Sequence, residues 1–379
     1  MMSLELLLKD YTLQIVALGS AVLGAVSGVL GSFAVLRKQS LLGDAVSHAA
    51  LPGIAVVFLI TGIKNTEILL LGALISGLIG TFMIIIIDQY TRIKFDSALG
   101  LTLSSFFGLG LVLLTYIQKL PNSNQAGLEH FIFGQASTLL KRDVFIMIGL
   151  GLFILLVVGL FWKELKLFSF DPEFGKSIGF SNVKTNVILS SITVVAIIIG
   201  LQSVGVILMS ALLIAPGVAA RQWTDKLSMM VVLAALFGIF SGVLGTLISS
   251  LVDNMPTGPV IVVVISLIVF LSLLFASNRG ILWRHIKHGK NKKNINDSRI
   301  LINLYELALN HEDVYHPHKT RVINLTNKKN KGNVNAIKSL LYLCEKGYAK
   351  KDYFDTWSIT DKGINKAKSI IENQGRENL

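Results

Sequence analysis

Cysteine and charge are scarce in this 379-residue sequence. Its single cysteine, Cys344, excludes a disulfide framework, a thiolate zinc cluster and an iron–sulfur centre. Charged residues make up 15% of the chain, against about 25% in an ordinary soluble domain. Hydrophobic residues make up 52% and the mean hydropathy is +0.64, so an ordinary globular enzyme is also excluded. No short cleavable signal precedes the first long apolar run, which we therefore expect to be retained.

The charges that are present are distributed unevenly along the chain. Residues 1–278 contain 15 Lys and Arg against 13 Asp and Glu, whereas residues 279–379 contain 20 against 10. We therefore expect a transmembrane domain over 1–278, a basic linker over 279–297 and a small soluble domain over 298–379. Attraction to anionic lipid is the simplest role for such a linker beside a membrane.

Eight apolar segments lie in residues 1–278, each near or above the about 20 residues that cross a bilayer as a helix. They cover residues 11–36, 39–63, 68–87, 97–118, 144–162, 185–220, 227–252 and 254–278. Alternation of the β-barrel type is absent, so the sequence predicts an all-α membrane domain. The segment 185–220 is too long for one ordinary pass and contains Gly205 and Pro216, so it forms either one tilted helix or two short ones.

Loop charge favours two helices in that segment. Nine passes place ten Lys and Arg on the side that holds the basic C-terminal region, and five on the other. Eight passes split the same residues eight to seven, with the C-terminal region opposite the eight. We therefore expect about nine helices, the N-terminus outside and residues 279–379 in the cytoplasm. Small residues four apart, Gly24 with Gly28 and Gly72 with Ser76 and Gly80, are typical of closely packed membrane helices.

The most distinctive pattern is a charged pair inside an apolar segment, Asp44 and His48. Residues four apart on a helix point the same way, and an aspartate within a membrane costs about 2.5–3.5 kcal/mol, so it usually has a function. A carboxylate with an imidazole suits first-row divalent metals such as manganese, iron or zinc. Two other interpretations stay open. Asp44 and His48 could be a structural pair that only hydrogen-bonds to each other inside the bundle, or Asp44 could lie at the cytoplasmic interface. Ser40 and Ser47 are near enough in sequence to contribute.

Three motifs, in this order, resemble the permease subunits of bacterial manganese/zinc/iron ABC importers. The first is the Asp-x-x-x-His-Ala-x-x-Pro-Gly pattern of residues 44–53. The second covers residues 170–180 and the third residues 205–216, and the resemblance extends over roughly residues 10–280. One departure is Gly175, where that family more often has alanine.

The resemblance implies a fold like that of the vitamin B12 and siderophore importers, with two permease subunits around a central path. It implies that Asp44 and His48 bind the transported ion in that path, with no permanently bound cofactor. It also implies a separate ATP-binding subunit, an extracytoplasmic metal-binding lipoprotein and a second permease subunit, identical or paralogous, in the bacterial cell membrane. By the same analogy the ATPase docks on a cytoplasmic coupling helix, formed by Asp171, Pro172, Glu173, Phe174, Gly175, Ile178 and Gly179. An amphipathic interfacial turn is the alternative interpretation.

A phosphate-binding loop is mimicked by Gly175, Lys176 and Ser177, but the pattern needs a glycine where Phe170 stands. We therefore expect no ATPase site and no catalytic residues in this chain, which is predicted not to be an enzyme.

The region after the linker predicts helices, a hairpin over 348–359 and a last helix from about residue 361 through Ile371. This order is similar to the winged-helix domain of iron- and manganese-dependent repressors, which implies that residues 334–345 form a helix able to enter the major groove. The net charge of +10 over 279–379 suits a surface facing phosphates. Dimerisation or protein contact is the alternative, and DNA binding is not the expected role of the intact membrane-anchored chain.

His311, Glu312, Asp313, His316 and His318 gather in one stretch of this region. Histidine with carboxylate suits the same divalent ions, so a cytoplasmic metal sensor is one hypothesis. Solvated loop histidines are the alternative.

Two other classes of function compete with the ABC permease. One is an ion-coupled secondary metal transporter in which Asp44 and His48 relay protons. The other is a membrane-anchored, metal-responsive transcription regulator.

Overall fold

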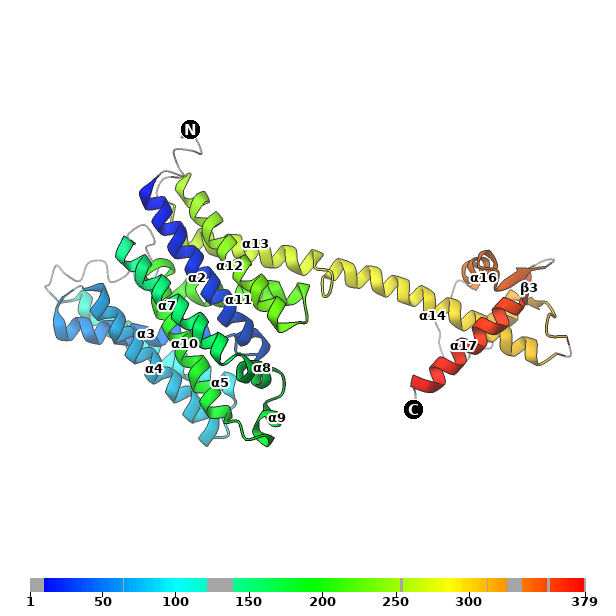
Figure 1. Cartoon of the computed structure of the whole chain (residues 1–379), viewed down its shortest axis with the longest axis horizontal. Helices are drawn as coiled ribbons and strands as arrows, with labels where there is room; N and C mark the ends of the chain where they lie inside the picture. Colours follow the sequence, from blue (N-terminus) through cyan, green and yellow to red (C-terminus); the bar gives the residue numbers. More distant parts are fainter. Residues whose placement is uncertain are drawn as a thin grey trace. The chain divides into compact units, whose positions relative to one another are not determined.

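The computed structural model describes residues 10–63, 65–120, 139–252, 255–311, 313–325, 336–352 and 355–377. The chain divides into two compact units, Met1–Ile281 and Leu282–Leu379, and each is described by itself. Figure 1 shows long helices in the first unit, and one long helix, shorter helices and a small sheet in the second.

The first unit is a bundle of long apolar helices, as predicted. In the described residues eight helices are long and apolar enough to cross a membrane, namely α2 (Tyr11–Leu36), α3 (Leu42–Thr61), α4 (Thr66–Tyr90), α5 (Phe95–Gln118), α7 (Lys141–Leu160), α10 (Asn182–Val204), α12 (Leu227–Ser250) and α13 (Thr257–Phe275). A further helix, α11 (Val206–Trp223), follows α10, and two short helices, α8 (Trp162–Phe170) and α9 (Pro172–Ser177), lie between α7 and α10.

The long segment 185–220 is divided at Gly205 into α10 and α11. Gly205 has φ 87° and ψ 167°, a backbone conformation that residues other than glycine essentially never adopt. Its N–H still donates to the carbonyl of Leu201 at 3.0 Å, which caps α10. Loop charge favoured two helices here, and the structure has two; the nine-pass count and the orientation of the termini stay predictions.

Small residues allow the helices to approach closely, as their spacing predicted. A Cβ atom on Gly24 would lie 2.2 Å from the carbonyl oxygen of Gly238, and one on Gly28 would lie 2.3 Å from that of Ala234. Helix α2 therefore packs backbone to backbone against α12, and it also packs along α11 (Figure 1). A similar approach joins α3 to α4, where a Cβ on Gly53 would lie 2.1 Å from the oxygen of Gly72.

The second unit contains α14 (Ile281–Leu309), β1 (His318–Lys319), α15 (Thr320–Leu325), α16 (Ala336–Glu345), β2 (Ala349–Lys351), β3 (Thr356–Ile359) and α17 (Asp361–Glu377). The strands form an antiparallel sheet in the order β1-β3-β2, with His318 opposite Trp357. Trp357 is buried together with Leu304, Ile323 and Leu340, so the sheet and the helices share one core.

Three features of this unit differ in extent from the sequence expectation. Helix α14 already begins at Ile281, so most of the expected linker over 279–297 is helical; that stretch contains no proline to prevent it. Strand β1 was not predicted, because two residues carry no periodicity. Helix α17 continues past Ile371 to Glu377, and the hairpin of residues 348–359 is present as β2 and β3. Of the expected helix over 334–345, residues 334 and 335 lie outside the described part of the chain.

Candidate functional site

Asp44 and His48 lie on the first two turns of α3, one turn apart. The Nε2 atom of His48 is 3.3 Å from Oδ1 of Asp44, so the two side chains point the same way, as their spacing predicted. The carboxylate in the first turn is also favoured by the positive end of the helix dipole. Asp44 is 35% exposed and His48 15%, so the pair is half-buried, with its carboxylate the more accessible member.

The His48 ring is held by its surroundings. Phe107 of α5 meets it edge to face, with the ring centroids 4.6 Å apart. Its Nδ1 atom is buried and has no hydrogen-bond partner in the described part of the chain. The Nε2 nitrogen is therefore the one that shares a space with the Asp44 carboxylate.

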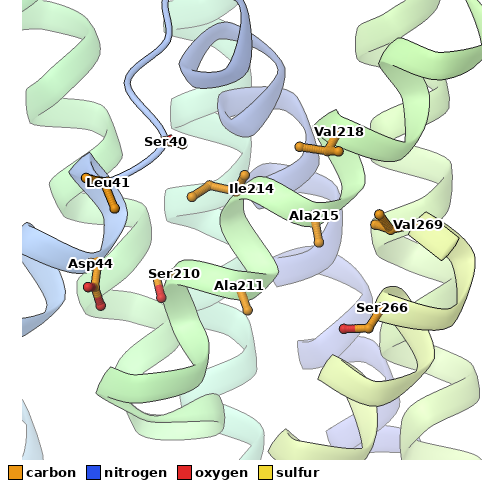
Figure 2. Close-up of a pocket in the computed structure, with 10 residues that line it drawn as sticks. All are labelled: Ser40, Leu41, Asp44, Ser210, Ala211, Ile214, Ala215, Val218, Ser266 and Val269. Atoms are coloured by element: carbon orange, nitrogen blue, oxygen red, sulfur yellow. The ribbon is translucent and has the colours of Figure 1, made fainter. Parts of the chain in front are cut away.

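A cavity of about 440 Å³ borders Asp44 (Figure 2). Its walls come from the start of α3 with the residues just before it, from α11 and from α13, and are formed by Ser40, Leu41, Asp44, Ser210, Ala211, Ile214, Ala215, Val218, Ser266 and Val269. Asp44 is the one charged side chain among these ten residues, and Figure 2 shows its carboxylate beside the Ser210 hydroxyl of the neighbouring α11. A carboxylate at the edge of an apolar cavity is suited to receive a cation.

The two serines near the pair differ in placement. Ser40 lines the cavity, whereas Ser47 is fully buried and its hydroxyl has no partner in the described part of the chain. Ser210 and Ser266, which also line the cavity, were not singled out as site residues from the sequence. Serines inside apolar helices were the only signal, and most such serines bond their own backbone.

The donors at this site suit a transient ion better than a fixed one. One carboxylate oxygen and one imidazole nitrogen can bind a first-row divalent ion together. Within the described residues, no three or more His, Cys, Asp or Glu side chains are already arranged to hold a metal ion. Further ligands at Asp44 and His48 would have to be water, hydroxyls or groups from another subunit.

The expected coupling segment is an exposed turn built by its own side chains. Asp171 caps α9 by accepting a hydrogen bond from the backbone N–H of Phe174 at 2.9 Å, and Pro172 occupies the first turn of that helix. Gly179 follows with φ 90°, a value that favours glycine. Phe174 is 54% exposed and Ile178 50%, so apolar side chains project from this turn.

The remaining residues of the segment have distinct positions. Gly175 is buried, and a Cβ there would lie 3.1 Å from the ring of Phe168 in α8. Glu173 is exposed. Gly175, Lys176 and Ser177 lie within α9 or at its last position, whereas a phosphate-binding loop follows a strand.

Three histidines of the second unit, His311, His316 and His318, come together in space. Ring centroids are 4.6 Å apart for His311 and His316, 5.0 Å for His311 and His318, and 5.5 Å for His316 and His318. Burial lowers the pKa of His318, and the nearby His311 and His316 lower it further. Glu312 lies outside the described residues, and Asp313 accepts a hydrogen bond from the backbone N–H of Tyr315 at 2.9 Å.

Long apolar helices around a carboxylate–imidazole pair beside a cavity define a multi-pass membrane transport protein. The chain belongs to the ABC 3 transport family, which it matches over residues 9–276. That match covers nearly all of the first unit and ends before α14.

Curated relatives match most of the chain. The zinc transport system membrane protein TroC of Treponema pallidum is 53% identical over 284 residues, which are 75% of this chain and 95% of TroC. The manganese transport system membrane protein MntC of Bacillus subtilis is 43% identical over 304 residues, 80% of this chain and 70% of that protein.

Solved structures agree on the fold of the bundle. PsaBC from Streptococcus pneumoniae in complex with Fab is 33% identical with a TM-score of 0.63, covering 75% of this chain and 98% of that one. A structure described as an inward-facing metal-chelate type ABC transporter has a TM-score of 0.54 at 16% identity, covering 71% and 87%, which shows likeness of fold alone.

Proposed function

We propose that this chain is the permease subunit of an ATP-driven importer of divalent metal ions, manganese, zinc or iron, in a bacterial cell membrane. The observation that carries the proposal is the Asp44–His48 pair beside the cavity, in a chain similar to zinc and manganese transport membrane proteins. ATP hydrolysis belongs to a separate subunit, and the chain is not itself an enzyme.

The transported ion exchanges part of its water shell for the Asp44 carboxylate and the His48 imidazole as it crosses. Two protein ligands replace only part of the hydration, so the ion is also released easily. The only cysteine, Cys344, lies outside the bundle, and the absence of thiolates from the path avoids tight retention of borderline metals such as zinc. The hydroxyls of Ser40, Ser210 and Ser266 line the same cavity and supply polar contacts for the remaining water.

A second permease subunit, identical or paralogous, completes the path on the open side of this cavity. An extracytoplasmic metal-binding lipoprotein delivers the ion on the outer side. The N-terminus lies outside, and the turn around α9 and the C-terminal unit lie in the cytoplasm, as the excess of Lys and Arg in those loops predicts.

The ATP-binding subunit docks on the turn from Asp171 to Gly179. Asp171, Pro172, Gly175 and Gly179 shape the turn, while Glu173, Phe174 and Ile178 are exposed and supply the contact. Exposed aromatic and aliphatic side chains on a fixed turn are the usual anchors of such an interface.

The second unit is proposed to be a winged-helix domain. Its order, helix, strand, two helices and a hairpin, with strand order β1-β3-β2, supports this assignment. On α16, Ile337 is 51% exposed and Leu341 45%, which favours contact with protein over contact with DNA. A membrane-anchored transcription regulator therefore ranks below the transport function.

The transport proposal is tested by replacing the pair in cells that depend on this importer. His48→Leu removes a nitrogen ligand at similar volume, and Asp44→Asn removes the charge that offsets the cation. Either change should abolish uptake of radioactive manganese or zinc while protein level and ATPase association stay near normal. Asp88→Asn, at an exposed carboxylate of α4, is the control and should transport normally.

A purely structural Asp–His pair gives a different result. Removing one partner would then leave a buried polar group without a hydrogen bond. The amount of assembled protein would therefore fall before transport per molecule did. Normal uptake by a well-expressed His48→Leu variant would contradict the metal role.

A further inference from the structure

The segment that joins α14 to β1 brings three imidazoles together, far from the Asp44–His48 pair in sequence. His311 follows α14, His316 lies in the connection and His318 is the first residue of β1. His311 and His316 are exposed, but His318 is only 7% exposed. The Nε2 atom of His318 is buried and has no hydrogen-bond partner in the described residues, which calls for an explanation because buried polar atoms are normally paired.

The spacing of the rings matches that of three imidazoles on one ion. Imidazole nitrogens bind zinc at about 2.0–2.1 Å in a tetrahedral arrangement, which places the ring centroids about 5 Å apart. The three observed separations are 4.6, 5.0 and 5.5 Å. The rings are thus at the right separation, although their nitrogens are not yet arranged as a ligand set. Rotation of the two exposed side chains, a fast motion, would complete it.

Hydrogen bonds hold the connection in place. Asp313 accepts from the backbone N–H of Tyr315 at 2.9 Å, and its carbonyl accepts from the N–H of His316 at 3.1 Å. The Tyr315 hydroxyl donates to Asp361, at the start of α17. Because these hydrogen bonds already order the connection, less conformational entropy is lost when an ion binds.

We propose that His311, His316 and His318 bind one first-row divalent transition-metal ion, zinc-like in its preference for nitrogen ligands. The absence of carboxylates from the trio argues against magnesium or calcium, which prefer oxygen. Because His318 pairs with Trp357 across the sheet, the bound ion ties the connection after α14 to strand β3. The site is independent of the transport function proposed above.

The test is cobalt binding to the purified full-length protein in detergent, because tetrahedral Co²⁺ with nitrogen ligands absorbs visible light. All proteins contain Asp44→Asn and His48→Leu, so that the pair in α3 cannot contribute. The parent should bind one Co²⁺ with tetrahedral absorption, and Zn²⁺ should displace it. His316→Gln should weaken binding by about tenfold or more, since changes around a ligand alone cost about 10–100-fold.

Two further variants make the outcome decisive. The exposed His311 and His316 can be replaced together without disturbing the core, which covers the case in which buried His318→Gln fails to fold. His288→Gln, at a histidine of α14 outside the trio, should bind as the parent does. Absence of tetrahedral absorption in the parent, or equal binding by the parent and the His311→Gln/His316→Gln protein, would leave only solvated imidazoles and overturn the proposal.

Discussion

Single residues set both the packing of the bundle and its chemistry. Glycine is required where α2 crosses α12, because the space that a side chain would need is occupied by the carbonyl groups of Gly238 and Ala234. At the site, a carboxylate and an imidazole lie on adjacent turns of α3, and the carboxylate of Asp44 lines the cavity. Helix α3 thus packs closely against α4 at Gly53 and carries a carboxylate at Asp44, nine positions earlier.

Gly28→Val should destabilise the bundle. Its Cβ would lie 2.3 Å from the Ala234 carbonyl oxygen, so α2 and α12 would have to separate, at a cost of about 1–3 kcal/mol or more. Gly149→Val is the matched control, because nothing lies within 4 Å of a Cβ at that exposed helical position. Thermal unfolding of the two variants in detergent measures the difference; equal melting temperatures would contradict the packing argument.

At the residue scale, the sequence predicted Asp44 and His48 because a spacing of four on a helix is local information. It did not predict the cavity, because Ser210 and Ser266 come from helices more than 160 residues further along the chain. The convergence of His311, His316 and His318 was suggested by their proximity in sequence, but the burial of His318 depends on strand β1, which periodicity could not reveal.

At the scale of elements, the turn around α9 and the break at Gly205 are two places where single residues set the end of a helix. Apolar runs between charged residues predicted the long helices well, because a helix that crosses a membrane needs about 20 mostly apolar residues. They left the division of 185–220 open, since only the backbone angles of Gly205 decide it. They also missed the early start of α14, because the residues of the expected linker are mostly polar and show no apolar period.

Phe174→Ala with Ile178→Ala should weaken docking of the ATP-binding subunit by about 2 kcal/mol or more, as removal of central interface anchors does. The bundle should fold normally, because both side chains are exposed. Phe240→Ala is the control, at a phenylalanine of α12 that is 56% exposed. Co-purification with the ATPase and stimulation of its activity measure the effect. Unchanged association of the double variant would remove the coupling role of this turn.

At the scale of the whole molecule, the chain is a permease bundle followed by a separate basic unit. The family match ends at residue 276, and the match to TroC covers 95% of TroC but 75% of this chain. Arg279 still belongs to the bundle, since it donates to Asp225 at 2.7 Å and its N–H donates to the Gln222 carbonyl.

A chain ended after residue 281 should therefore fold and retain metal uptake, because the first unit has its own core and keeps the Arg279 contacts. Uptake in cells, normalised to the amount of protein in the membrane, measures this. Loss of uptake by a stably inserted truncated chain would show that the C-terminal unit takes part in transport itself.

The most direct measurement of the central claim is metal uptake by vesicles that contain this chain, its ATP-binding subunit and the metal-binding lipoprotein. Radioactive manganese or zinc should accumulate only when ATP reaches the ATPase, and Asp44→Asn should reduce uptake to the level seen without ATP. Uptake driven by a proton gradient in vesicles without any ATPase would contradict the account and favour a secondary transporter.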